Sequence, residues 1–566
     1  MRITNKIMQR NNLSNINTNK MYQDRLSTQM STQKKINRPS EDPVVAIRSL
    51  RLRSNVTEIT QYYSKNIPDA ESWIKITEDA LSKLTDVLSN MIGQCTRGTN
   101  NPFTTEDRGI VLEQLKLLSE EVYATGDADY AGRYVFTGYR TDTPLSFQSE
   151  RNQKYTITEQ LDKNAIDSVI SVDTGRVLEI NSANYDKIDN GIGANGGKDD
   201  GTGTKITEDD ISSVEVHRIR LAYNDCLDAK ENGIDLVPTI SFVTSANADG
   251  TINTNVWAGG AGTSPAPTHQ ITKMNSYEKN PDPYTYVAKD DDAIVYVPET
   301  GELLLGKNRY EELMAKKDSE STANVNEGEI RITYEKENWQ KGDLRPEHYF
   351  YCKADKVDDL GNLVMGADGK TPERIEYNDT YLTTSAERQV IEYDVGFNQS
   401  VRINSRADEC FNHGIGREVD DMVNAMQDVL DLEGTVADIE AIMEKLDESQ
   451  TTEMGILQKQ LDAANKALTY AKEKEQKMFE GAITAFQKYL DETNLCVTAC
   501  GSRGSKLDLI KNRSQNQKTT YETLKSENED IDITEVAIQL NSAELTYDAA
   551  LMAAGKVMKT TLLDFI

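Results

Sequence analysis

The sequence predicts an α+β fold in which long helices from both ends of the chain enclose a β-rich middle region. Apolar residues recur every three or four positions before about residue 140 and again after residue 408, which is the spacing of amphipathic helices. Between residues 141 and 408 the pattern changes to short alternating runs separated by Gly, Asn, Asp and Pro, which is typical of strands and turns. Since helical segments flank the middle on both sides, we expect them to pack on each other as a coiled-coil rod.

The first helix is expected within residues 2–35, a segment rich in Asn and Thr. These residues have low helix propensity because their side chains compete for backbone hydrogen bonds, so this helix needs a partner to form. Its apolar face is expected to consist of Ile3, Ile7, Leu13, Ile16, Tyr22, Leu26 and Met30, of which all but Tyr22 are candidate assembly residues.

Two prolines separate this helix from the next. Pro39 and Pro43 disfavour α conformation at the preceding residues, Arg38 and Asp42, so the first helix should end near Ile36. Asp42 is then placed to cap a second helix whose first residue is Pro43, where a missing N–H costs nothing.

The second helical run is expected to continue to about Arg97, with a kink or break at Pro68. Its second half has a clear apolar face, and a further helix is expected at residues 105–125. The apolar face consists of Trp73, Thr77, Leu81, Leu84, Leu88 and Met91.

The middle region should begin with a strand in "GRYVFTGY" and end with a hairpin around "GFNQ" in residues 390–404. Helical spacing then returns and reaches the last helix. The apolar face of that helix is expected to include Val536, Leu540, Tyr547, Leu551 and Met558. These patterns divide the chain into segments 1–42, 43–140, 141–408, which could hold two subdomains, 409–528 and 529–566.

Composition argues against several classes of function. The formal charge of −30 and the absence of a long basic stripe disfavour a nucleic-acid partner, and Arg48, Arg51 and Arg53 are interpreted as a solvated helix face. Apolar runs are too short to span a membrane, and the start of the chain has no readable secretory signal. The six cysteines are too scattered for a compact disulfide framework, and we expect free thiols. No motif supports a catalytic, cofactor or metal site, so an enzyme is not expected.

Several stretches together resemble the flagellar hook-associated protein 3 family of the flagellin superfamily. They are "MRITN", "INRPSEDPVVAIRSLRLRS", "DAESWIKITEDALSKLTDVL", "AGRYVFTGYRTDTPL", "SKLDLIKNR" and the final "LLDFI". The resemblance covers roughly the first 145 and last 70 residues. Pro68, the six cysteines and the long middle region depart from the family pattern, and the last leaves the role of the middle region open.

The resemblance implies a non-enzymatic adaptor at the hook–filament junction of an extracellular bacterial flagellum. Its implied partners are further copies of the chain in a ring, hook-associated protein 1, flagellin and an export chaperone that holds the C-terminal helix during type III export. The implied assembly surface consists of the apolar residues named above in the first and last helices, together with Leu562, Leu563 and Phe565. Two alternatives remain open: a flagellin-type filament subunit, and a secreted coiled-coil adhesin with a β-rich binding head.

Overall fold

The computed structural model describes residues 5–99, 104–161, 165–193, 202–231, 233–247, 251–263, 265–277, 282–317, 329–358, 363–366, 369, 371–383, 388–446 and 450–559. The chain forms two compact units. The terminal unit comprises Met1–Ser72, Glu392–Val401 and Arg503–Ile566, and the central unit comprises Trp73–Ile391 and Arg402–Ser502.

Long helices and several β-sheets confirm the α+β class, while the coiled-coil rod and the division into five segments stay predictions. The α-helices are α1 Asn5–Thr32, α2 Pro43–Gln61, α3 Ile67–Thr99, α4 Thr105–Gly126, α5 Pro283–Lys289, α6 Lys307–Lys317, α7 Ala407–Cys410, α8 Gly414–Met443, α9 Thr451–Glu529 and α10 Ile533–Lys559.

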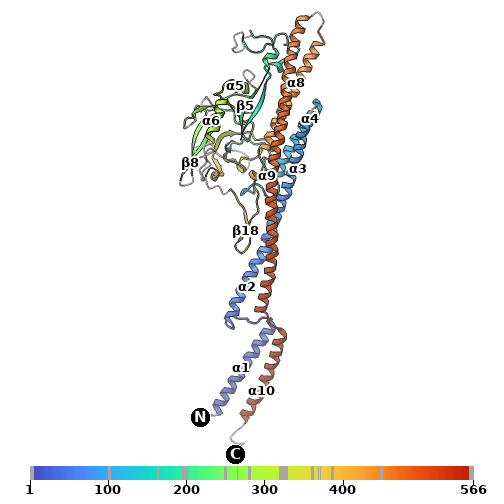
Figure 1. The fold of residues 1–566 in the computed structure, drawn as a ribbon. Coiled ribbons are helices and arrows are strands. Elements are labelled where there is room, and N and C mark those ends of the chain that lie inside the picture. Colours follow the sequence, from blue (N-terminus) through green and yellow to red (C-terminus); the bar gives the residue numbers. More distant parts are fainter. Residues whose placement is uncertain are drawn as a thin grey trace, which may run out of the picture. The chain divides into compact units, whose positions relative to one another are not determined.

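In the terminal unit, α1 and α10 run side by side in opposite directions, so that the start of α1 lies beside the end of α10 (Figure 1). Helix α1 ends at Thr32, one turn earlier than the prolines alone predict. Helix α2 begins as expected: Asp42 Oδ1 accepts hydrogen bonds from the amides of Val44 and Val45 at 3.0 and 3.1 Å, and Pro43 occupies the first turn.

The chain stays helical through Pro68, although proline has no N–H to donate. A π-helical turn, η1 Tyr62–Asn66, joins α2 to α3, and the amide of Ile67 donates to the carbonyl of Tyr62 five residues earlier. A proline ring normally collides with the carbonyl four residues before it, and the wider π turn relieves that crowding.

The predicted hairpin packs beside this π turn, within the terminal unit. Strands β17 Glu392–Gly396 and β18 Gln399–Arg402 form a two-stranded sheet, which confirms the hairpin. Tyr62 meets the ring of Phe397 edge-to-face at 5.9 Å, and the Asn66 amide nitrogen donates to the Asp394 carbonyl at 2.7 Å. The hairpin thus binds the chain where the helix changes its geometry.

The central unit is built on parts of α3 and α9 together with α4 and α8, which lie side by side (Figure 1). All six residues of the predicted α3 face, Trp73, Thr77, Leu81, Leu84, Leu88 and Met91, are buried, which confirms that prediction. Arg108 of α4 is buried among these helices and joins three of them, because its guanidinium lies 3.0 Å from Glu433 of α8 and 3.1 Å from Glu475 of α9.

Two larger sheets make up most of the β structure of the central unit. One has the strand order β10-β9-β8-β14-β3-β15-β16 and the other β11-β12-β13-β5-β4, and pairs β1-β2 and β6-β7 form small separate sheets. The strands are β1 Asp129–Tyr130, β2 Arg133–Tyr134, β3 Tyr155–Leu161, β4 Ile166–Asp173, β5 Ser212–Arg220, β6 Lys230–Glu231, β7 Ile234–Asp235, β8 Thr239–Ala246, β9 Ile252–Gly259, β10 His269–Gln270, β11 Thr272–Lys273, β12 Ile294–Val297, β13 Glu302–Leu305, β14 Ile330–Lys336, β15 Tyr351–Asp355 and β16 Arg374–Tyr377.

The strand expected in "GRYVFTGY" is much shorter than its aromatic composition suggests. Only Arg133 and Tyr134 of this stretch form a strand, β2, and a turn through Ala131 and Gly132, both at positive φ, returns the chain from β1. The residues that follow are buried without joining a sheet, among them Phe136, which packs edge-to-face on Phe411 at 4.8 Å. Burial against Phe411, the residue that follows α7, has overridden the β propensity of the segment.

The first turn of α8 is closely packed because it begins with glycines. A methyl group at Gly414 would overlap the Tyr489 hydroxyl, and one at Gly416 would lie 2.9 Å from the hydroxyl of Tyr123. That second hydroxyl accepts a 2.8 Å hydrogen bond from the Gly416 amide. The glycines therefore allow two partly buried phenols to reach the helix N-terminus.

We expect Gly414→Ala to lower the free energy of unfolding of the central unit by about 1–3 kcal/mol, because the methyl group overpacks the contact with Tyr489. The matched control is Gly434→Ala in the same helix, where a methyl group meets open space. That change should stabilise by about 0.5–1 kcal/mol. Urea unfolding followed by circular dichroism measures both, and equal effects of the two substitutions would contradict the packing argument.

Candidate functional site

Two parts of the terminal unit carry the residues expected to act in assembly: the pair α1 and α10, and the junction where these helices meet α2 and α9. Helices α1 and α10 contact each other along one face of each helix. Leu26, Val536 and Ala543 are buried between them, and Ile531 and Leu540 pack against that cluster. We call this set the inner face of the pair.

The expected assembly residues divide into three groups. Leu26, Val536 and Leu540 belong to the inner face, and Ile16 and Tyr547 are half-buried. Ile7, Leu13, Met30 and Leu551 have exposed fractions of 50, 63, 36 and 44%. Ile3, Leu562, Leu563 and Phe565 lie outside the described residues, as does the side chain of Met558 within α10.

Helix α10 has a second apolar stripe that the sequence reasoning missed. Ile538, Leu545 and Met552 are spaced by seven residues and are exposed by 66, 72 and 67%. We call these three residues the outer stripe of α10. The seven-residue interval is visible in the sequence and is typical of helices that pack against other helices. The stripe therefore offers an apolar surface after the inner face is filled.

The junction between the helices is organised around Glu529, the last residue of α9. Arg53 of α2 donates from Nε and Nη2 to the two carboxylate oxygens at 2.6 and 2.8 Å, and the hydroxyl of Ser49 donates to the same carboxylate. Lys34 Nζ, in the linker after α1, lies 3.6 Å from it. The Glu529 cluster, comprising these four residues, thus joins segments that are nearly 500 residues apart in the chain.

Backbone hydrogen bonds reinforce this cluster. The amide of Lys35 donates to the Glu529 carbonyl at 2.7 Å, and the amide of Ile531 donates to the Gln33 carbonyl at 3.2 Å. The linker after α1 therefore pairs with the linker before α10. Of the predicted junction residues, Asp42 and Pro43 start α2, while Arg38 and Pro39 are exposed in the intervening turn.

Electrostatics at the junction favour the ionised carboxylate. The side chain of Glu529 is only 4% exposed. Hydrogen bonds from Arg53 and Ser49, with the charges of Arg53 and Lys34, outweigh the cost of this burial and lower the pKa of Glu529 to about 2. Arg48, Arg51 and Arg53 are all exposed, which agrees with the predicted solvated face, but Arg53 has a further role because its guanidinium neutralises the buried acid Glu529.

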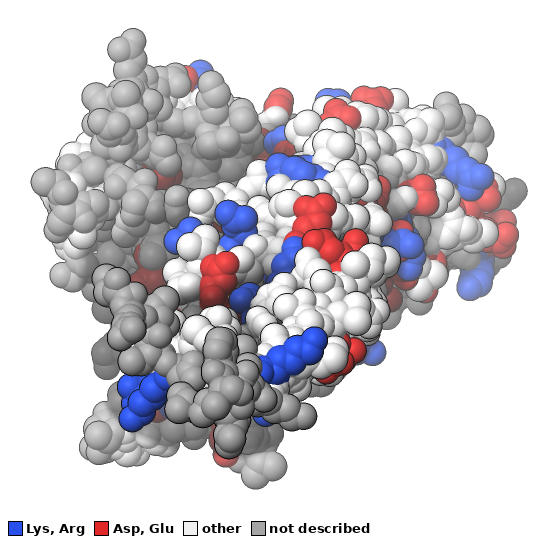
Figure 2. All heavy atoms as spheres, turned by 90° about the horizontal axis from the view of Figure 1, so that it is seen from below, with Lys and Arg blue, Asp and Glu red and all other residues white. Residues whose placement is uncertain are grey.

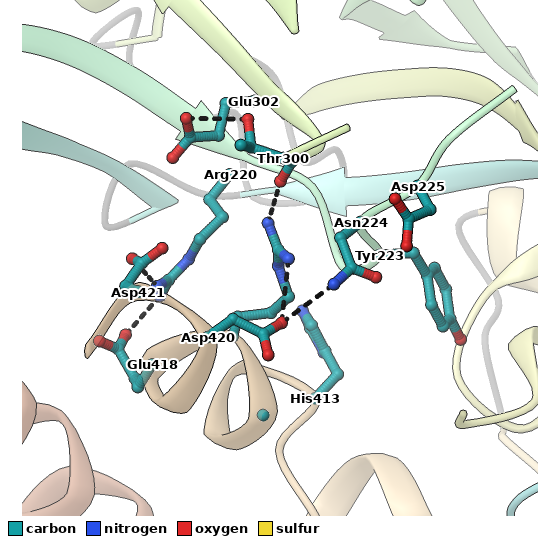
Figure 3. A network of polar contacts seen from close by, with 12 residues as sticks. Arg220, Tyr223, Asn224, Asp225, Thr300, Glu302, His413, Glu418, Asp420 and Asp421 are labelled. Carbon is teal, nitrogen blue, oxygen red and sulfur yellow. Dashed lines mark hydrogen bonds and ion pairs between the residues drawn. The ribbon is translucent and has the colours of Figure 1, made fainter. Parts of the chain in front are cut away.

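In the central unit, a network of ion pairs fixes strand β5 on helix α8, and Figure 3 shows the part that Arg220 makes with Glu418 and Asp421. Arg218 bonds Asp167 of β4 at 3.1 Å, Asp421 of α8 at 2.6 Å, and Glu302 of β13. Arg220 bonds Asp421 at 2.7 Å and also Glu418. We call these six residues the Arg218 network.

Strand and helix periodicity explain why these side chains meet. Arg218 and Arg220 are two residues apart and lie on the same face of β5, while Glu418 and Asp421 are three apart on one face of α8. Burial opposes ionisation of Asp421, but the charges of Arg218 and Arg220 outweigh it and lower the pKa of Asp421 to about 2. The sequence shows that the two arginines share one face of a strand and that the two acids share one face of a helix. It does not show that these two faces meet.

A cavity of about 600 Å³ lies beside this network, between α4, the start of α8 and loops of the β region. His413 lines it, and burial together with the charges of Arg220 and Arg417 lowers the pKa of His413 to about 4, so that its ring is neutral at pH 7. Asp420, on the same wall, bonds Arg417 at 3.3 Å and accepts a hydrogen bond from Asn224 at 3.2 Å (Figure 3). These contacts hold the polar side chains in place and do not set up a nucleophile with its base.

Glu159 of β3 is the carboxylic acid whose pKa burial raises to about 7, in spite of hydrogen bonds from the Tyr334 hydroxyl and the Ala222 amide. A shifted pKa can mark a catalytic acid, but Glu159 is fully buried and lines neither this cavity nor the neighbouring one beside Arg218. In the described parts of the chain, no cluster of His, Cys, Asp and Glu has the arrangement of a metal site.

Surface charge is of mixed sign on the face shown in Figure 2, where Lys and Arg are interspersed with Asp and Glu and separated by uncharged residues. None of the helices in the described residues is both long enough and apolar enough to cross a membrane.

Comparisons with known proteins point to one superfamily. Residues 3–141 match the family model of the bacterial flagellin N-terminal helical region. The chain is 25% identical over 166 residues to flagellar hook-associated protein 3 of Salmonella typhimurium, covering 29% of this chain and 52% of that protein. It is 26% identical over 177 residues to the Escherichia coli protein of the same name, covering 31% and 55%. The chain therefore spans about half the length of these curated relatives.

Two further similarities are weaker. A flagellin of Clostridium tyrobutyricum is 27% identical over 122 residues, covering 22% of this chain and 32% of that protein. The crystal structure of flagellar hook-associated protein 3 from Legionella pneumophila is 9% identical and covers 84% of this chain and 97% of that one, with a TM-score of 0.28. A score this low supports no conclusion about a shared arrangement.

Replacing Glu529 by Gln should loosen the junction by about 1.5 kcal/mol, because a neutral amide cannot accept two charge-assisted hydrogen bonds from Arg53. We expect a roughly tenfold faster amide exchange at Lys35 and Ile531, measured by NMR or mass spectrometry. Glu527→Gln, an exposed neighbour, is the matched control and should change neither rate.

The pH dependence of this effect has a definite sign. Since the pKa of Glu529 is lower in the folded chain, its contribution is complete above the ordinary value of 4.5 and disappears as pH falls through about 2. The difference between the native chain and Glu529→Gln should therefore shrink below pH 4.5. A difference that stays constant down to pH 2 would show that the charge of Glu529 is not its source.

Arg218→Met should destabilise the central unit by about 3–5 kcal/mol, because it leaves the Glu302 carboxylate, only 2% exposed, without its cation. Thermal or urea unfolding measures the loss. Arg97→Met removes an exposed arginine of α3 and should change stability by less than about 0.5 kcal/mol. A loss from Arg218→Met as small as that of the control would contradict a structural role for the network.

Proposed function

Because this chain is of the hook-associated protein 3 type within the flagellin superfamily, we propose that it is a structural adaptor of the bacterial flagellum. In this proposal, copies of the chain form a ring that joins the hook-associated protein 1 layer to the flagellin filament outside the cell. The role is mechanical, and neither an enzyme activity nor a cofactor is part of it.

The outer stripe of α10 is the observation that carries this proposal. A monomer gains nothing from three large apolar side chains that are exposed by 66 to 72% at a seven-residue interval, whereas a neighbouring helix would bury them. Leu13 and Ile7 of α1, exposed by 63 and 50%, add apolar surface on the partner helix. A second copy of the same helix pair is the occupant we propose, since its stripes have matching spacing.

The low helix propensity of α1 fits assembly outside the cell. A segment rich in Asn and Thr unfolds readily when separated from α10, and a weakly held helix is suited to passage through an export channel in an unfolded form. We extend the proposal to export by the flagellar type III route, with a chaperone that covers the C-terminal helix until its partner is present.

The β-rich part of the central unit would then be a rigid body fixed to its helices by the Arg218 network. A ring subunit must transmit torque without yielding, and buried ion pairs that span strand and helix restrict relative motion of the two. Its surface is free to vary without altering the terminal helices.

Leu545→Asp tests the proposed contact, with Asn541→Asp as a control that adds the same charge at an exposed polar position of the same helix. Both monomers should fold alike by circular dichroism, because neither side chain is buried. We expect Leu545→Asp to reduce filament formation at least tenfold in cells that lack their own copy, while Asn541→Asp supports it. Normal filaments with Leu545→Asp would exclude the outer stripe as an assembly contact.

Immunolabelling of intact flagella distinguishes this role from its rivals. A discrete band at the filament base supports the adaptor, and labelling along the whole filament would assign the chain to the flagellins, which the similarity to the Clostridium tyrobutyricum protein makes the nearest alternative. Diffuse labelling of the cell surface would instead indicate an adhesin.

A further inference from the structure

Two cysteines that are far apart in the sequence meet in the central unit. Cys410 is the last residue of α7, and Cys496 lies in the middle of α9. The Cys496 thiol donates to the Glu409 carbonyl at 3.0 Å, and the Thr493 hydroxyl bonds the Cys410 carbonyl at 3.3 Å. One turn of α9 therefore holds the end of α7 through two hydrogen bonds.

Because the Cys496 thiol bonds the carbonyl of Glu409, it lies beside the next residue, Cys410, whose thiol is its hydrogen-bond partner. Other thiols have different neighbours: Cys95 lies 3.6 Å from the Met422 sulfur, and Cys226 and Cys500 bond backbone carbonyls. Both members of the pair are free thiols in this structure.

We propose that Cys410 and Cys496 are a site of reversible disulfide formation that covalently fastens α7 to α9. The oxidant is a low-molecular-weight disulfide, of which oxidised glutathione is the example used below. This inference concerns the chemistry of the folded central unit and does not depend on the proposed function.

The reaction proceeds in two exchange steps. Cys496, which is partly exposed, loses its proton and attacks one sulfur of the external disulfide, forming a mixed disulfide and releasing one small thiolate. Cys410 then loses its proton and attacks the Cys496 sulfur, and the second small thiolate leaves. Two protein thiols and one external disulfide become one protein disulfide and two small thiols, so atoms and electrons balance.

Burial determines the order of these steps. Cys410 is only 3% exposed. The hydrogen bond with Cys496 and this burial hold the pKa of the Cys410 thiol well above its usual value, so it reacts slowly with reagents in solution. It can react with a sulfur already in contact with it, which makes Cys496 the entry point and Cys410 the resolving thiol.

A bond at this position would close a loop that contains the whole of α8, the turn after it and more than half of α9. Cross-links that close long loops reduce the freedom of the unfolded chain more than those that close short ones. The oxidised protein should therefore resist thermal unfolding more than the reduced protein, with Tm higher by about 5 °C.

The experiment incubates the folded, full-length chain with oxidised glutathione, blocks remaining thiols with iodoacetamide, and maps non-reduced peptides by mass spectrometry. We expect a cross-linked peptide pair that contains Cys410 and Cys496, with the other four cysteines alkylated after denaturation. Addition of dithiothreitol should abolish the cross-link and return Tm to its starting value.

Two variants identify the roles of the pair. Cys410→Ser should stop the reaction at a stable glutathione adduct on Cys496, and Cys496→Ser should leave Cys410 unmodified. Cys95→Ser, a buried cysteine elsewhere in the unit, is the control and should form the cross-link like the native chain. The proposal fails if the native chain keeps all six thiols free, retains a glutathione adduct on Cys496 with Cys410 present, or cross-links another pair.

Discussion

The carboxylate of Glu529 is the interaction on which the organisation of the terminal unit depends. It lies at the end of the longest helix and is bound by a guanidinium, a hydroxyl and an ammonium group that belong to the other end of the chain. A buried carboxylate without these donors would be unstable, so the N-terminal and C-terminal segments must come together before this helix can end where it does. As a result, the linker between α1 and α2 forms backbone hydrogen bonds with the linker before α10, and α1 lies beside α10.

Buried carboxylates are also paired with arginines in the central unit, where the network contains more residues. Arg218 binds carboxylates from β4, β13 and α8, Arg220 binds two carboxylates of α8, and Asp421 is shared between the two arginines. Such networks stabilise little in net terms, because desolvation offsets most of the attraction, but they are costly to break and therefore specify one arrangement. In a chain whose acidic residues greatly outnumber its basic ones, the buried arginines are the groups that select which acids lie inside.

Much of the secondary structure followed from local chemistry. The Asp42 and Pro43 helix start, the buried face from Trp73 to Met91 and the hairpin of β17 and β18 are set by residues within a few positions of each other. Pro68 correctly predicted an irregularity in the helix. The sequence pattern did not predict the π turn, which accommodates the proline without a break in the helix. It overestimated the strand after Gly132, because the burial of Phe136 depends on Phe411, a residue far along the chain.

The sequence by itself determined that both ends of the chain are helical, where α2 begins and that the terminal helices carry apolar residues, but it did not predict α5 and α6 within the β-rich region. It could not determine which of those residues are buried, since α10 has two stripes with helical spacing and only the position of α1 makes Val536 an inner residue and Leu545 an outer one. Nor could it connect Arg53 with Glu529, or Arg218 with Asp421, because a charge shows its sign in the sequence but not its partner. The tertiary structure decides which apolar residues are buried and which charges are paired, because a buried charge without a partner would be strongly destabilising.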